Sequence, residues 1–244
     1  MSNQVVLLHG FGTNHQVFAD FVPLLSPYQA LALDLMGYDG ESSEFILSQA
    51  VDILSKKIDN AVHLLGWSLG GVVALEMAAR KPEKVKTLTL ISSFAKYAKT
   101  DDYAAGVDIS GFQKYAQNFA DDFSGSLNNF FRLNAMANPN KIPQFERLAE
   151  KIIAFRTPEK SVLLSSHKAV MESDLREKLP KIQIPTLIIT GEKDRITPPA
   201  MGDYLQQNLP NAQRLHFANA THTPFIDTAT ECANALKEFW SRYA

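Results

Sequence analysis

The 244-residue chain contains one cysteine, Cys232, so it cannot form an intramolecular disulfide or a cysteine-based zinc site. No apolar run approaches the roughly 18 residues of a membrane span, and the first residues lack the basic segment of a secretion signal. Lys and Arg total 24 against 26 Asp and Glu, and this net charge of −2 gives no general attraction to nucleic acid or anionic lipid. These absences predict a soluble cytoplasmic protein that binds neither nucleic acid nor membranes.

Short apolar runs alternate with amphipathic segments in the first and last thirds of the chain. Six runs have the character of buried strands, at residues 5–8, 30–33, 61–65, 85–91, 185–190 and 214–217. Helices are predicted over residues 15–25, 44–59, 69–80 and 229–243. This alternation predicts an α/β fold, a mainly parallel sheet with helices on both faces.

Between residues 94 and 179 the alternation stops, and the pattern becomes helical. Aromatic side chains recur three to four residues apart, at Phe112, Tyr115, Phe119 and Phe123. Such a helix face packs into a core more often than it lines a ligand site. We therefore expect a helical cap over residues 94–179, inserted into a core of residues 1–93 and 180–244.

Residues 66–71 (GWSLGG) lie between a predicted strand and a predicted helix. They fit the G-x-S-x-G nucleophile elbow, in which a strained turn holds a serine hydroxyl clear of the sheet. The alternative is a glycine-rich turn in which the serine has no function. A chance match to the motif is less frequent when a strand precedes it and a helix follows it, as here. We predict that Ser68 is a nucleophile.

A serine nucleophile needs a base, and the base needs an orienting acid, in the chain order Ser, acid, His. Asp194 follows the strand at 185–190, and His222 lies in the loop after the strand at 214–217. We predict Asp194 as the acid and His222 as the base. Glu192, two residues nearer the strand, is the alternative acid.

The other histidines show no spacing typical of a metal site. His63 and His216 fall within predicted strands, where core or interface roles are usual. His15 and His167 fall in predicted helices without a partner motif, so we expect them on solvated faces. The predicted chemistry needs no metal and no cofactor.

The first strand ends in residues 9–12 (HGFG), which match the loop that supplies one oxyanion donor in hydrolases of this type. The second donor is the amide of the residue after the nucleophile. We predict that the backbone N–H groups of Phe11 and Leu69 form the oxyanion hole, and that His9 shapes the loop without transferring protons.

Together these motifs resemble the α/β-hydrolase superfamily. In finer detail they resemble the pimeloyl-acyl carrier protein methyl ester esterases of biotin synthesis, through residues 66–71, 217–226 (FANATHTPFI), 174–176 (DLR) and 130–134 (FFRLN). The resemblance implies a carboxylesterase that cleaves a methyl ester on an acyl carrier protein. We also expect the protein to be a monomer. It implies substrate contacts at Phe11, Ser68, Leu69, Phe130, Phe131, Arg132, Leu133, Asn134 and His222.

The chain departs from the family pattern near the site. Phe11 stands where tryptophan is usual, and the turn at residues 34–40 (DLMGYDG) lacks the common proline and carries an extra residue. Residues 132–168 hold seven Lys and Arg against three Glu, a net charge of +4. This segment could steer an acidic carrier protein, although a solvated helix face has the same composition.

Fold and triad leave two other functions open. One is a C–C bond hydrolase or lyase that acts on a small acid. The other is a non-catalytic receptor that keeps the pocket to sense a ligand, and an intact triad counts against it.

Overall fold

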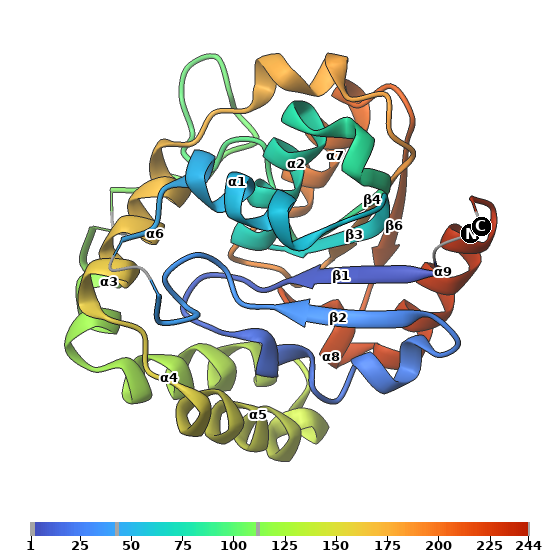
Figure 1. The fold of residues 1–244 in the computed structure, drawn as a ribbon. Helices are drawn as coiled ribbons and strands as arrows, with labels where there is room; N and C mark the ends of the chain where they lie inside the picture. Colours follow the sequence, from blue (N-terminus) through green and yellow to red (C-terminus); the bar gives the residue numbers. More distant parts are fainter. Residues whose placement is uncertain (1–2, 42–43, 111–112, 244) are drawn as a thin grey trace.

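The computed structural model describes residues 3–41, 44–110 and 113–243 (Figure 1). Its six strands form one parallel sheet in the order β2-β1-β3-β4-β5-β6. They are β1 (Gln4–Leu8), β2 (Gln29–Leu33), β3 (Val62–Trp67), β4 (Val85–Ile91), β5 (Thr186–Gly191) and β6 (Ala212–Phe217). Every strand that the apolar runs predict is present, and the predicted parallel sheet is confirmed.

Helices cover both faces of this sheet. They are α1 (Leu47–Lys57), α2 (Leu69–Arg80), α7 (Pro199–Asn208), α8 (Pro224–Asp227) and α9 (Ala229–Ser241). In Figure 1, α1, α2 and α7 lie on one side of the sheet, and α8 and α9 lie on the other. Because both faces are covered, the strands β1, β3 and β5 are buried along almost their whole length rather than at alternate positions.

The helix predicted over residues 15–25 is wrong. This segment forms two short 3₁₀ turns, His15–Phe18 and Val22–Leu25. Pro23 stands at the start of the second turn, where its missing amide and fixed φ begin a new turn rather than continue a helix.

Four helices follow one another between β4 and β5: α3 (Gln113–Asp121), α4 (Phe123–Ala135), α5 (Ile142–Phe155) and α6 (Lys160–Glu172). The arrows of β1 and β2 point toward α3 and α6, so these helices stand at the carboxyl end of the sheet (Figure 1). The two ends of the insertion meet, since Lys96 and Asp174 form an antiparallel β-bridge and the amide of Leu175 donates to the carbonyl of Ala95. That junction supports our proposal that residues 94–179 form a cap.

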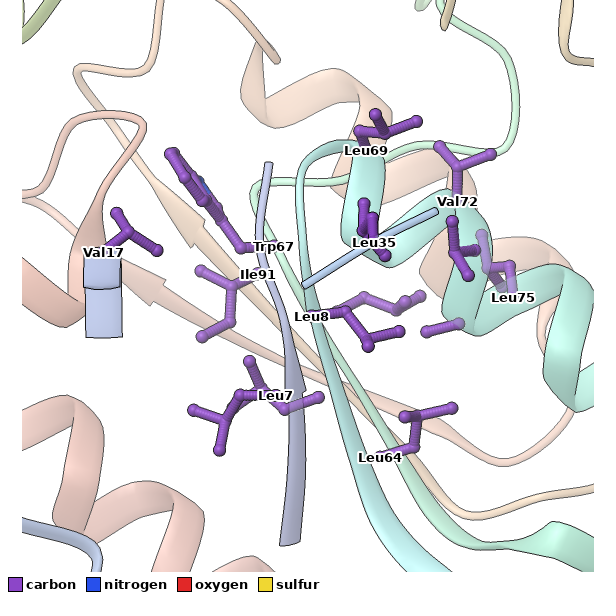
Figure 2. Packing of buried hydrophobic residues seen from close by; sticks show 14 of the residues in the cluster. Leu7, Leu8, Val17, Leu35, Leu64, Trp67, Leu69, Val72, Leu75 and Ile91 are labelled. Atoms are coloured by element: carbon purple, nitrogen blue, oxygen red, sulfur yellow. The ribbon is translucent and has the colours of Figure 1, made fainter. Parts of the chain in front are cut away.

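The core fills the space on both sides of the central strands. Leu7 and Leu8 are neighbours in β1 and point to opposite faces, yet both are fully buried. Figure 2 shows Leu7 on the side of Val17, and Leu8 on the side of α2 with Leu75. Burying each of these leucines contributes about 2 kcal/mol, so their packing stabilises the sheet that carries the site.

Candidate active site

Ser68 occupies a strained turn between β3 and α2. Its φ of 54° and ψ of −118° lie in a region that residues other than glycine rarely adopt. A Cβ on Gly70 would lie 2.2 Å from the carbonyl oxygen of Leu8, so only glycine lets α2 approach β1 this closely. The Ser93 hydroxyl donates to the Ser68 carbonyl at 2.9 Å and braces the turn. This geometry is that of the predicted elbow.

His222 and Asp194 form a buried hydrogen-bonded pair. His222 Nδ1 lies 2.9 Å from Asp194 Oδ2, and both side chains are almost completely buried. The ionised carboxylate only accepts, so the proton of the neutral ring lies on Nδ1. Nε2 is then free to take a proton, which is the role of a general base.

Asp194 is held by its own loop. The amides of Ile196 and Thr197 donate to Oδ1 at 2.9 and 2.8 Å, and the Thr197 hydroxyl donates to Oδ2 at 2.6 Å. Burial acts to raise the pKa of Asp194, but the facing His222 and the donors from Thr197 outweigh burial and hold the pKa below its usual value. The carboxylate therefore stays charged at neutral pH.

The loop that carries His222 is fixed from both sides. The Trp67 indole N–H donates to the His222 carbonyl at 2.8 Å. Asp227 Oδ2 accepts from the amide and the hydroxyl of Thr221 at 2.7 and 2.6 Å. Sequence reasoning missed Thr197, Trp67 and Asp227, because no motif spacing marks residues that act through a neighbour.

A cavity of about 920 Å³ opens beside these groups, and Ser68 and His222 both line it. In the described part of the chain, His222 hydrogen-bonds Asp194 and does not hydrogen-bond Ser68. Contacts between nucleophile and base are often long without substrate and shorten in the complex. Most of the cavity wall is aromatic or aliphatic, with Phe11, Phe94 and Phe130 among its members.

Only part of the predicted substrate-contact stretch faces this cavity. Phe130, Leu133 and Asn134 line it. Phe131 instead packs against Phe145 in the core, with ring centroids 5.6 Å apart, and Arg132 is exposed and donates to Asn129. Residues 130–134 belong to α4, where positions i, i+3 and i+4 share a face and the two between them point elsewhere.

Helices α3 and α6 supply cavity residues that we expected elsewhere. Tyr115 and Phe119 line the cavity, whereas Phe123 is in the core and Phe112 lies outside the described residues. His167 also lines the cavity, and its ring centroid is 5.8 Å from that of Phe11. The prediction of a solvated face for His167 is wrong, because Phe11 and Tyr115 of α3 lie against this side of α6.

The remaining candidate groups have other partners. Glu192 pairs with His216 on the sheet edge, whereas the Asp194 carboxylate faces His222. His15 pairs with Asp34 at 2.9 Å. His63 is buried in β3, as its place in an apolar strand predicts.

The predicted oxyanion donors lie at two backbone turns. Leu69 is the first residue of α2, so its N–H has no acceptor within the helix. Leu69 is fully buried and is absent from the cavity wall. The Phe11 side chain lines the cavity.

His9 shapes the loop that Phe11 belongs to. Its Nδ1 donates to the Gly10 carbonyl at 2.8 Å, and its Nε2 accepts from the Leu35 amide at 3.0 Å. Burial lowers the pKa of His9 to about 4, so the ring is neutral at pH 7.

Within the described ranges, no three His, Cys, Asp or Glu side chains group closely enough to hold a metal ion. None of the helices in those ranges combines the length and apolar character that a membrane crossing requires.

The chain matches the family described as alpha/beta hydrolase fold over residues 3–229. The pimeloyl-acyl carrier protein methyl ester esterase of Neisseria meningitidis serogroup C is 34% identical, over 97% of this chain and 93% of its own length. The enzyme of the same name from Nitrosomonas europaea is 30% identical, over 95% of this chain and 94% of its own length.

Solved structures agree on the fold. An esterase from Exiguobacterium antarcticum has a TM-score of 0.85 at 22% identity, covering 98% of this chain and 91% of that one. An enol-lactonase from Burkholderia xenovorans has a TM-score of 0.83 at 21% identity, covering 99% of this chain and 92% of that one. At these identities the likeness shows the fold alone.

Proposed function

Since this chain belongs to the α/β-hydrolase family, and since its relatives there are pimeloyl-acyl carrier protein methyl ester esterases, we propose that it hydrolyses the methyl ester of pimeloyl-acyl carrier protein. It is a carboxylic ester hydrolase. The observation that carries the proposal is the buried Asp194–His222 pair, whose histidine lines one cavity with the strained Ser68. The reaction frees methanol and the terminal carboxylate of the acyl chain.

The first half of the reaction acylates the serine. The Ser68 hydroxyl attacks the ester carbonyl while His222 Nε2 takes its proton, and Asp194 stabilises the imidazolium that forms. The amides of Phe11 and Leu69 bind the negative oxygen of the tetrahedral intermediate. His222 then gives its proton to the departing methoxide, and methanol leaves.

The second half frees the acid. Water attacks the acyl-enzyme carbonyl, and His222 takes the water proton. Collapse of the second intermediate gives that proton to Ser68 and releases the carboxylic acid, which loses its remaining proton to solvent. The contact with Asp194 keeps the proton of the neutral imidazole on Nδ1, so Nε2 can accept a proton in both halves of the reaction.

The cavity suits a long acyl chain with a polar arm behind it. Its volume of about 920 Å³ lies near the upper end of small-molecule sites, which span about 300–1,000 Å³. Phe119 and Phe130 offer apolar surface for methylene groups, whereas Asn118 and Asn129 offer hydrogen bonds. The pocket therefore fits an acyl chain joined to an amide-containing carrier arm.

The basic segment of residues 132–168 is the proposed docking face for the acidic carrier. Some of its cations are already engaged, since Lys151 pairs with Asp20 and Lys160 pairs with Asp121. Lys141 and Arg147 have no ion pair among the described residues. Charge reversal at these two positions is expected to raise KM for the carrier-bound ester and leave hydrolysis of a free methyl ester unchanged.

We also propose that the enzyme acts as a monomer in the cytoplasm.

The test is methanol release from methyl pimeloyl-acyl carrier protein, together with growth of a biotin auxotroph that lacks its own esterase. The wild-type chain should support both, and Ser68→Ala should lower kcat by about 10⁶ while the protein stays folded. Preference for C–C bond cleavage of a small acid would replace the substrate assignment. Failure of an organophosphonate to label Ser68 would favour a receptor.

A further inference from the structure

A chain of buried hydrogen bonds links the proposed oxyanion loop to the cap. The Gly12 amide lies 3.2 Å from the Tyr38 hydroxyl oxygen, which lies 2.8 Å from Ser166 Oγ. Ser166 Oγ lies 3.3 Å from the Leu163 carbonyl of the same helix, α6. Tyr38 and Ser166 are both buried, so water does not compete for these bonds.

Chemistry fixes the direction of this chain. The Gly12 amide can only donate, and the Leu163 carbonyl can only accept. The Tyr38 hydroxyl therefore accepts from Gly12 and donates to Ser166, which donates to Leu163. Burial raises the pKa of Tyr38 to about 12, so the hydroxyl keeps the proton that the chain requires across the working pH range.

The bond to Tyr38 also bears on which amide faces the substrate. The Gly12 N–H is already used, so within residues 11–12 the amide of Phe11 is left for the oxyanion. Gly12 has a φ of 68°, and a Cβ there would lie 2.9 Å from the Phe119 ring of α3. The loop is therefore held by the turn that carries Tyr38 on one side and by the cap on the other.

We propose that Tyr38 is a positioning residue for the oxyanion hole. Its hydroxyl holds the Gly12 amide and thereby orients the Phe11 amide, and its bond to Ser166 couples that orientation to α6 of the cap. The inference deepens the proposed function, because it uses the same reaction site. It also gives a role to the turn at residues 34–40, where the chain departs from the family pattern.

The experiment compares Tyr38→Phe with Tyr103→Phe. Tyr103 is an equally buried tyrosine whose hydroxyl has no partner among the described residues, so it controls for loss of a buried hydroxyl. Both variants are assayed on p-nitrophenyl butyrate and titrated with a trifluoromethyl ketone, whose tetrahedral serine adduct places its oxygen in the oxyanion hole.

Tyr38→Phe should lower kcat about tenfold and raise the inhibition constant of the ketone by a similar factor, because the hole is misaligned rather than removed. KM should stay within about twofold, since binding of the ground state is unaffected. Tyr103→Phe should change none of these values. Equal effects of the two variants, or a change in KM alone, would overturn the proposal.

Ser166→Ala keeps the Gly12–Tyr38 bond and removes only the link to α6. It should lower kcat about threefold and raise the inhibition constant in parallel, and it carries the test alone should Tyr38→Phe not fold. An unchanged kcat in Ser166→Ala would contradict the proposal that the oxyanion hole is coupled to the cap. Because p-nitrophenyl butyrate needs no carrier protein, this test remains valid even if the physiological substrate is not a methyl ester on an acyl carrier protein.

Discussion

Each side chain of the proposed triad depends on neighbours outside the triad. Ser68 is held by a turn that glycine makes possible, and Asp194 receives three hydrogen bonds from its own loop. The carbonyl of His222 is fixed by the indole of Trp67. The orientation of the reacting atoms therefore belongs to the surrounding backbone as much as to the triad.

Asp194→Asn tests the orientation of the imidazole. The amide would offer its NH₂ group to His222 Nδ1 and would favour the tautomer with its proton on Nε2, which cannot act as a base. We expect kcat to fall about 10⁴-fold with little change in KM. Steady-state kinetics on a free methyl ester measure this, and a loss below tenfold would mean that another carboxylate orients His222.

Thr197→Val tests the support of the acid. Valine matches the shape of threonine but cannot donate to Asp194 Oδ2, a bond of 2.6 Å in the structure. Hydrogen bonds to charged groups are worth about 1.5–3 kcal/mol, so kcat/KM should fall at least about tenfold. Thr197→Ser keeps the hydroxyl and should retain most activity, whereas equal losses in both variants would point to packing.

Among the elements, α4 shows how capping and helix geometry shape the cavity. Asp122 caps the helix, and its carboxylate accepts from the Gly125 amide at 2.9 Å. The same helix brings Phe130, Leu133 and Asn134 to the cavity about two to three turns later. A change at the cap should therefore affect stability more than chemistry.

Asp122→Ala is expected to lower the free energy of unfolding by about 1 kcal/mol, because the amide at the start of α4 loses its acceptor. Asp122→Asn keeps an acceptor oxygen and should stay within a few tenths of a kcal/mol of wild type. Urea unfolding of the three proteins measures the difference. An alanine variant as stable as wild type would show that the cap bond contributes nothing.

The sequence predicted the elements whose signals are local. The strands followed from apolar runs, and Ser68, Asp194 and His222 followed from their places at strand ends. The face of α4 did not follow, because family likeness marks residues 130–134 as a block while helix geometry sends Phe131 and Arg132 away from the cavity. The place of His167 in the cavity wall depends on contacts with Phe11 and Tyr115, which lie far from it in the sequence.

For the molecule as a whole, the sheet covered on both faces also buries histidines that stay neutral. His63 in β3 is fully buried and hydrogen-bonds Thr87 at 2.9 Å. Burial, with a smaller contribution from Lys86, lowers the pKa of His63 to about 4. His9 at the end of β1 has its pKa lowered to about 4 as well, mainly by burial.

These buried histidines set a pH dependence of stability. A histidine in the unfolded chain titrates near 6.5, so between about pH 6.5 and 4 the unfolded state binds more protons than the folded state. The contribution of these two histidines to stability is therefore complete above about pH 6.5, falls as the pH drops through this window, and levels off below about pH 4. We expect His63 alone to account for about 3 kcal/mol of the loss.

The double variant His63→Leu/Thr87→Val removes the titrating ring together with its hydrogen-bond partner, so it leaves no unpaired hydroxyl at Thr87. Denaturant unfolding at pH 7.5 and pH 4.5 should show a smaller loss of stability in this variant than in wild type. The loss should not vanish, because His9 titrates in the same window. An identical loss in both proteins would mean that His63 is protonated as readily in the folded sheet as in the unfolded chain.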